Sequence, residues 1–206
     1  MAIALQNFSI DAAAGCLEGV LHVPQVDPRA IVVVAHPLPT MGGTMENKVV
    51  VTLAKTFAEL GCVTARFNFR GVGASAGEFT GGAGERQDLI AVAHHLQQQF
   101  AEPLPLLLAG FSFGGYVAAL AAEQLQARHL VLVAPAVGRF AMPTVSADAF
   151  VIHGEQDDVV PLADVLAWAR PQQLPIVVLP QVGHFFHGRL TQLRGLVRNH
   201  FTGVAW

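Results

Sequence analysis

Residues 106–115 read Leu-Leu-Leu-Ala-Gly-Phe-Ser-Phe-Gly-Gly and combine a short apolar run with the pattern G-x-S-x-G. The apolar run up to Gly110 is typical of a buried strand, and the chain from Gly114 onward is typical of a helix. A serine between a strand and a helix lies on a sharp, strained turn that exposes its hydroxyl, and small residues two positions away avoid a clash. Ser112 is therefore the predicted catalytic nucleophile.

A second serine lies in the same pattern, in the segment Gly-Ala-Ser-Ala-Gly of residues 73–77. The glycine-rich stretch continues to residue 82, and no helical pattern follows the serine directly. A solvated loop serine explains this match, because the strand and helix that the motif requires are missing. We therefore do not expect Ser75 to be catalytic.

Short apolar runs alternate with helical patterns on both sides of Ser112. The expected strands cover residues 31–35, 63–69, 104–110, 130–134, 149–153 and 176–179, and the expected helices cover residues 47–60, 85–100, 114–127, 161–169 and 188–200. Nearly unbroken Val, Ile and Leu indicates strands buried on both faces. The alternation predicts an α/β fold with a mostly parallel, doubly wound sheet and helices on both faces. The first twenty-odd residues are expected to form an antiparallel strand or hairpin at one edge.

The chain has 206 residues, which is typical of one domain, so residues 1–206 are expected to form a single domain. About fifteen residues separate the strands that end near residue 134 and begin near residue 149. That segment is too short for a lid domain. We therefore expect an active site that is open to solvent.

Charged residues make up only 13% of the chain, and hydrophobic residues make up 52%. This composition fits a heavily buried sheet, with apolar surface left for a substrate or a second subunit. A monomer or a homodimer is expected. The formal net charge is −3, and no basic stripe is present, so the sequence predicts no nucleic-acid partner.

The apolar runs are far shorter than the roughly 20 residues that a membrane-spanning helix needs. The first residues lack the basic and apolar regions of a signal peptide. Cys16 and Cys62 have apolar or small neighbours and are predicted to be buried free thiols. Together these features predict a cytoplasmic protein without a membrane partner.

Two loops after later strands carry the groups that a nucleophilic serine needs. Asp157 lies in the loop of residues 154–161, and His184 lies in the loop of residues 181–188. Ligands of doubly wound sheets bind at the carboxyl ends of the strands, and the order Ser, Asp, His is the order expected for this turn. Histidine can take the serine proton near neutral pH, and a carboxylate holds the imidazole in one tautomer. The predicted catalytic residues are Ser112, Asp157 and His184.

Three neighbouring residues offer alternatives. Asp158 could replace Asp157, although we expect it to cap the helix that begins near residue 161. His187 could replace His184, although a position at a helix start or in the pocket lining fits it better. His153 is expected to stabilise the turn after its strand through a hydrogen bond.

Acyl transfer also needs donors for the developing oxyanion. One expected donor is the backbone N–H of Phe113, at the positive end of the following helix. The second should come from the loop of residues 36–44, where Pro37 and Pro39 have no N–H. Leu38 is therefore the expected second donor.

Aromatic residues flank the predicted catalytic residues, namely Phe111, Phe113, Phe185 and Phe186. They suggest an apolar pocket for the acyl or alcohol group, although core packing explains each ring equally well. Phe111, Phe185 and His187 are the candidate substrate-binding residues.

Neither a metal nor a cofactor is predicted. Nine histidines are many for this length, but the chain has no C-x-x-C and no H-E-x-x-H. The glycines of residues 71–84 form neither a P-loop nor a dinucleotide-binding fingerprint.

Several sequence blocks resemble the α/β-hydrolase superfamily, and the resemblance covers nearly the whole chain. The blocks are His36-Pro37, residues 42–45, 47–49, 66–71 and 110–114, His153-Gly154 with Asp157, and residues 184–188. They are most similar to a small, lidless bacterial branch related to dienelactone hydrolase and prolyl-oligopeptidase-type enzymes. The resemblance implies an α/β-hydrolase fold with no lid, and the same three catalytic residues. Dienelactone hydrolase itself uses a cysteine nucleophile, so its substrate does not carry over to this chain.

The sequence thus predicts a serine hydrolase that forms an acyl-enzyme, acting on a small-molecule ester or other acyl substrate such as a thioester. The alternatives are a peptidase or amidase of the prolyl-oligopeptidase type, and a hydrolase-like protein that binds a ligand without turnover.

Overall fold

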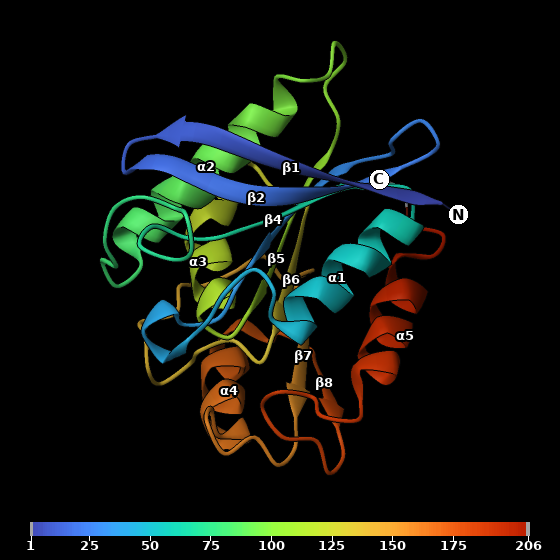
Figure 1. Cartoon of the computed structure of the whole chain (residues 1–206). Helices are drawn as coiled ribbons and strands as arrows, with labels where there is room; N and C mark the ends of the chain where they lie inside the picture. Colours follow the sequence, from blue (N-terminus) through green and yellow to red (C-terminus); the bar gives the residue numbers. More distant parts are fainter. Residues whose placement is uncertain (1, 205–206) are drawn as a thin grey trace.

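The structure is a computed structural model that describes residues 2–204, and it contains one eight-stranded sheet (Figure 1). The strands are β1 (Ile3–Ala12), β2 (Gly15–Pro24), β3 (Ile31–Ala35), β4 (Val63–Phe67), β5 (Leu106–Phe111), β6 (His129–Val133), β7 (Phe150–Gly154) and β8 (Ile176–Leu179). Their order in the sheet is β1-β2-β4-β3-β5-β6-β7-β8. The pairs β1·β2 and β2·β4 are antiparallel, and all other neighbours are parallel. The predicted mostly parallel sheet with a hairpin at one edge is therefore confirmed.

The helices cover both faces of the sheet (Figure 1). They are α1 (Lys48–Glu59), α2 (Ala83–Gln97), α3 (Phe113–Ala122), α4 (Leu162–Ala169) and α5 (Leu190–Phe201), with short 3₁₀ turns η1 (Pro39–Met41) and η2 (Arg170–Gln172). Buried residues of α1 and α5 form one apolar core, and those of α2, α3 and α4 form the other. Successive residues of β3 alternate between these two cores, as the pleat of a strand requires. This alternation explains why a fully buried strand reads as an unbroken apolar run.

The position of the candidate site follows from the strand order. β3 and β5 are neighbours, with Ala35 opposite Gly110. The chain continues from β3 to α1 on one face of the sheet, and from β5 to α3 on the other. Loops that leave adjacent strands toward opposite faces create a crevice at their carboxyl ends. The loop after β3 therefore lies beside the turn that carries Ser112.

No lid covers that crevice within residues 2–204. The segment between β6 and β7 contains neither a helix nor a strand, apart from an isolated bridge between Val137 and Phe140.

None of the described helices combines the length and the apolar character that a membrane span needs.

The prediction for the two cysteines is half correct. Cys62 is fully buried, and burial raises the pKa of its thiol to about 12. Cys16 is exposed on β2 instead, with its Sγ 2.9 Å from the hydroxyl of Ser9. The hairpin forms the edge of the sheet, so part of it faces solvent, which a local apolar pattern does not reveal.

Candidate active site

Ser112 lies on the sharp turn between β5 and α3. Its backbone has φ 55° and ψ −117°, on the left-handed side that L-residues rarely adopt. Its N–H donates to the carbonyl of Val133 at the end of β6, which fixes the turn to the sheet. The strained conformation predicted from the motif is confirmed.

Close packing explains the glycines on each side of the turn. A Cβ on Gly110 would lie 2.2 Å from the carbonyl oxygen of Gly114, and a Cβ on Gly114 would lie 2.2 Å from that of Ala35. Neither position therefore tolerates a side chain. The second contact also brings the turn against the end of β3.

His184 lies within hydrogen-bond distance of Ser112. Its Nε2 is 3.0 Å from the Oγ of Ser112, and its Nδ1 is 2.7 Å from Oδ2 of Asp157. All three side chains are buried, with at most 7% of any residue exposed. The structure thus brings together the three residues that the sequence singled out, from loops after β5, β7 and β8.

The loops after β7 and β8 are joined through their backbones, and this places His184 over Asp157. The N–H of Gln156 donates to the carbonyl of Val182 at 2.9 Å. A Cβ on Gly154 would lie 2.3 Å from that same carbonyl oxygen, so the close approach requires glycine.

Asp157 is held by hydrogen bonds at both carboxylate oxygens. Its Oδ1 accepts from the N–H groups of Val159 and Val160 at 2.9 and 2.7 Å, and its Oδ2 faces His184. Burial alone would raise the pKa of Asp157, but the hydrogen bonds from His184 and Val160 outweigh it and leave the pKa below its ordinary value. The carboxylate is therefore ionised at neutral pH.

His153 stabilises the same loop, as expected. Its Nε2 lies 2.9 Å from the carbonyl oxygen of Val160 and 3.5 Å from Oδ2 of Asp157. Because the carbonyl can only accept, Nε2 carries the proton. Burial lowers the pKa of His153, so this second histidine is neutral beside the carboxylate.

The alternatives for acid and base lie outside the hydrogen-bonded group. Asp158 is exposed, and the predicted cap is wrong, because α4 begins after Pro161 without a side-chain cap. His187 is exposed and forms part of a hollow next to the site.

Ser75 has a different role from the one expected. It is 6% exposed rather than solvated. Its hydroxyl donates to the carbonyl of Asn68 at 2.8 Å and accepts from the N–H of Glu18 at 3.1 Å. The glycine-rich loop is packed against the edge hairpin, so this serine is structural.

A pocket of about 350 Å³ opens at Ser112. It is lined by Pro37, Leu38, Met41, Gly42, Gly43, Asn47, Ser112, Phe113, Ala136, Arg139, Phe140, Val159, His184 and Phe185. Met41 and Phe185 are also among the most exposed large apolar side chains of the described chain, at 79% and 45%. The pocket therefore has exposed apolar side chains in its lining.

Both expected oxyanion donors border this pocket. The ring of Phe113 is fully buried against Phe69 and Phe140, so only its backbone can meet a substrate. The carbonyl of Leu38 accepts hydrogen bonds from the N–H groups of Met41 and Gly43 at 3.1 and 3.0 Å, which fixes the loop around its N–H.

His36 stabilises the loop that carries Leu38 through two hydrogen bonds of its imidazole. Its Nε2 accepts from the N–H of Phe69 at 3.1 Å, so its Nδ1 carries the proton and donates to the carbonyl of Pro37 at 2.7 Å. Burial lowers the pKa of His36 to about 4. Because one ring nitrogen donates and the other accepts, the imidazole of His36 is neutral.

Of the three candidate substrate-binding residues, only Phe185 is among the residues that line this pocket. Phe185 lines the pocket as expected. Phe111 is fully buried, with its ring 5.0 Å from that of His184, so it supports the base and does not line the pocket. His187 is absent from the lining of this pocket and lines a neighbouring hollow, which shares Gly42, Asn47 and Phe185 with the pocket.

The loop after β6 was not predicted as part of the site, and it contributes Ala136, Arg139 and Phe140 to the pocket. One signal was available. Arg139 is the only charged residue between residues 134 and 147, and this segment follows the carboxyl end of a strand.

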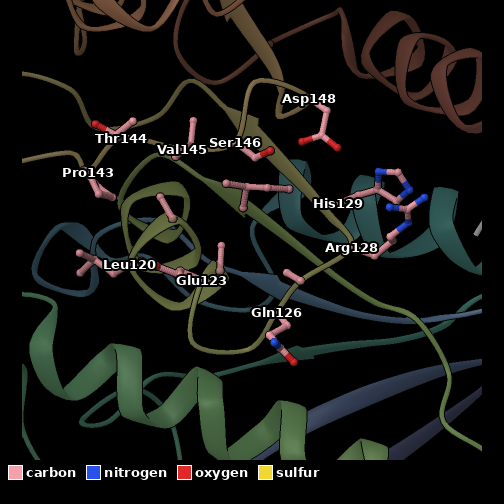
Figure 2. Close-up of a pocket in the computed structure, with 14 residues that line it drawn as sticks. Leu120, Glu123, Gln126, Arg128, His129, Pro143, Thr144, Val145, Ser146 and Asp148 are labelled. Carbon is pink, nitrogen blue, oxygen red and sulfur yellow. The ribbon is translucent and has the colours of Figure 1, made fainter.

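A second pocket, of about 380 Å³, lies elsewhere and holds none of the three hydrogen-bonded residues (Figure 2). It lies where β6 begins, beside the end of α3 and residues 143–148. The backbone N–H of Ser112 donates a hydrogen bond to the carbonyl of Val133, at the opposite end of β6. The pocket at Ser112 is therefore the candidate active site.

Residues 26–161 match the family described as serine aminopeptidase, S33. The chain belongs to the α/β-hydrolase superfamily. Two solved structures are similar to this hydrolase. XC6422 from Xanthomonas campestris, described as an α/β serine hydrolase without a lid, is 37% identical with a TM-score of 0.88, over 97% of this chain and 94% of that one. An α/β serine hydrolase homologue from Coxiella burnetii is 38% identical with a TM-score of 0.87, over 95% and 97% of the two chains.

A relative of this hydrolase in Rickettsia prowazekii, the uncharacterised protein RP471, is 35% identical over 160 residues. The match covers 73% of this chain and 66% of RP471, so the hydrolase spans slightly less than two thirds of that relative. Family and fold together make the chain a serine hydrolase of the lidless α/β type.

Proposed function

We propose that this α/β hydrolase is a carboxylesterase that cleaves small esters or thioesters through an acyl-enzyme on Ser112. One observation carries the proposal: the Oγ of Ser112 lies 3.0 Å from Nε2 of His184, whose Nδ1 is bonded to Asp157. A serine on a strained turn with this partner arrangement is equipped for nucleophilic attack.

The reaction has two halves. The Oγ of Ser112 attacks the ester carbonyl carbon while its proton passes to Nε2 of His184. The carbon–oxygen or carbon–sulfur bond then breaks, and the leaving alcohol or thiol takes that proton. A water molecule attacks the acyl-enzyme, transfers a proton to His184, and releases the carboxylic acid while Ser112 regains its proton. The N–H groups of Leu38 and Phe113 stabilise the oxyanion in both halves.

The pocket chemistry favours an ester over an aminopeptidase substrate, even though the matched family is described as serine aminopeptidase. An aminopeptidase has to hold a substrate ammonium group, for which a carboxylate is the usual partner. The described residues that line the pocket include no Asp and no Glu. Most of the lining is apolar, which suits a small acyl group.

A fluorophosphonate probe and 4-nitrophenyl acetate test the proposal directly. The probe should label Ser112, and Ser112→Ala should lose both labelling and ester hydrolysis. Ser75→Ala is the matched control, because it removes the serine of the other G-x-S-x-G segment. It should keep labelling and turnover, with a loss of stability of about 1 kcal/mol from its hydrogen bonds.

Two other results would redirect the assignment. Faster cleavage of aminoacyl amides than of matched esters would indicate a peptidase or amidase. A folded protein that is inert toward a broad ester panel and unlabelled by the probe would be a binding protein on a hydrolase scaffold.

A further inference from the structure

Arg139, an exposed residue with a permanent positive charge, is one of the residues that line the pocket at Ser112. Apart from His184, it is the only titratable residue among the described residues that line this pocket. The rest of the lining consists of apolar side chains, glycines, Asn47 and Ser112. A guanidinium beside an apolar wall is suited to a ligand with an apolar chain and one anionic group.

The guanidinium is held in place from one side only. Its Nε donates to the carbonyl of Val159 at 3.1 Å. Val159 is fixed in turn, because its own N–H donates to Asp157. The side chain therefore joins the loop after β6 to the loop that carries the candidate catalytic carboxylate.

The terminal nitrogens of Arg139 have no protein anion to satisfy them. Across residues 2–204 no carboxylate forms an ion pair with this side chain. Asp164 lies against Gly138, next to Arg139 in the chain, and still forms no ion pair with it. By contrast, Arg70 has its donors taken by Asp88.

We propose that Arg139 is a specificity-determining residue that binds a carboxylate on the substrate, so that the preferred substrates are esters carrying a carboxylate. The inference rests on the proposed esterase function. A guanidinium anchored through Nε still presents two terminal N–H₂ groups, and these match the two oxygens of a carboxylate. Arg139 is exposed, so the match in geometry between the two groups carries the preference more than the charge attraction alone.

Two pairs of substrates isolate the carboxylate. The first pair is the mono-4-nitrophenyl ester of adipic acid and 4-nitrophenyl hexanoate, which differ in the far end of the acyl chain. The second pair is 4-acetoxybenzoate and its methyl ester, which differ in the alcohol. Each pair is measured with the wild type, Arg139→Met and Arg139→Lys. Comparing the ratio of kcat/KM within a pair between the wild type and each variant cancels the difference in intrinsic reactivity between the two substrates.

Arg139→Met should lower kcat/KM for the carboxylate member of at least one pair by about 10- to 100-fold, as expected for hydrogen bonds to a charged group. The neutral member should change by less than about threefold. For Arg139→Lys, the kcat/KM for the carboxylate member should lie between the values for the wild type and Arg139→Met. Lysine keeps the positive charge but lacks the planar pair of N–H₂ groups of arginine. Added salt should weaken the wild-type preference. Arg198→Met, an exposed arginine of α5 away from this pocket, is the control for general charge effects and should leave both pairs unchanged.

If Arg139→Met lowers kcat/KM equally for both members of each pair, Arg139 only supports Val159. If the variant leaves both kcat/KM values unchanged, Arg139 binds no carboxylate. Either result overturns the inference while the esterase assignment stands. If the wild type cleaves neither member, the proposed esterase function fails instead. The rate at which a carboxylate-bearing fluorophosphonate labels Ser112, relative to a neutral one, then still tests Arg139. Equal labelling ratios in the wild type and Arg139→Met would overturn the inference.

Discussion

The Nδ1 atom of His184 lies 2.7 Å from Oδ2 of Asp157, and this bond decides which imidazole nitrogen faces Ser112 with a free lone pair. An ionised carboxylate can only accept, so Nδ1 carries the proton of the neutral ring. Nε2 is then left to accept the proton of the serine hydroxyl 3.0 Å away. The orientation of the base therefore depends on a residue 27 positions earlier in the chain.

Replacing Asp157 by Asn should lower kcat for ester hydrolysis by about 10⁴-fold, because the amide can hold the ring in the wrong tautomer. Asp158→Asn is the matched control, since that side chain is exposed. Steady-state kinetics with 4-nitrophenyl acetate measure both variants. Similar kcat values for the two variants would contradict the assignment of Asp157.

Leu38→Pro should remove one oxyanion donor without disturbing the loop. The φ of Leu38 is −53°, which a proline ring allows, so the main change is the loss of the N–H. We expect kcat to fall by about 10²- to 10³-fold. Leu38→Ala keeps the N–H and should retain most of the activity. If the alanine variant lost as much as the proline variant, the side chain and not the N–H would be responsible.

Gly114→Ala should abolish the active turn. The added methyl group would lie 2.2 Å from the carbonyl oxygen of Ala35, which is backbone and cannot move aside cheaply. Gly115→Ala tests the same helix one residue later, where the nearest atoms are 3.4 Å or more away. Thermal unfolding and probe labelling should be severely affected in the first variant and nearly normal in the second. A normally stable and active Gly114→Ala protein would show that the turn is placed differently.

The free energy of unfolding should decrease as the pH falls from about 6.5 to 4, partly because of His36. Burial lowers the pKa of His36 from 6.5 to about 4 in the folded chain. Between these values the unfolded chain binds a proton that the folded chain does not, so stability is full above pH 6.5 and is lost on acidification. The contribution of His36 is about 3 kcal/mol over this window.

Urea unfolding of the wild type and of His36→Gln at pH 7.5, 6 and 5 checks this dependence. His22, whose pKa burial also lowers to about 4, contributes to both proteins, so the difference between the two slopes isolates His36. The variant should have the shallower slope even if it is less stable overall. Identical slopes would show that His36 is accessible to protons in the folded chain.

The sequence predicted the strands and helices more accurately than it predicted which side chains are exposed. The expected strand of residues 104–110 is β5 (Leu106–Phe111), and the helix expected from residue 114 is α3, which begins one residue earlier. Apart from the helix cap expected of Asp158, the errors concern exposure: Ser75 is buried, Cys16 is exposed, and Phe111 lies behind His184. Exposure depends on which distant segment covers a residue, and hydrophobic periodicity carries no information about that segment.

Amino-acid order alone was enough for the alternation of strands and helices, the strained serine turn and the succession Ser, Asp, His, because each is a property of neighbouring residues. The tertiary structure decided which histidine meets Ser112, which acid meets that histidine, and that Arg139 reaches Val159 in another loop. These choices depend on how loops from separate strands pack together at one edge of the sheet. Such contacts form between residues that are far apart in the chain, so local pattern does not determine them.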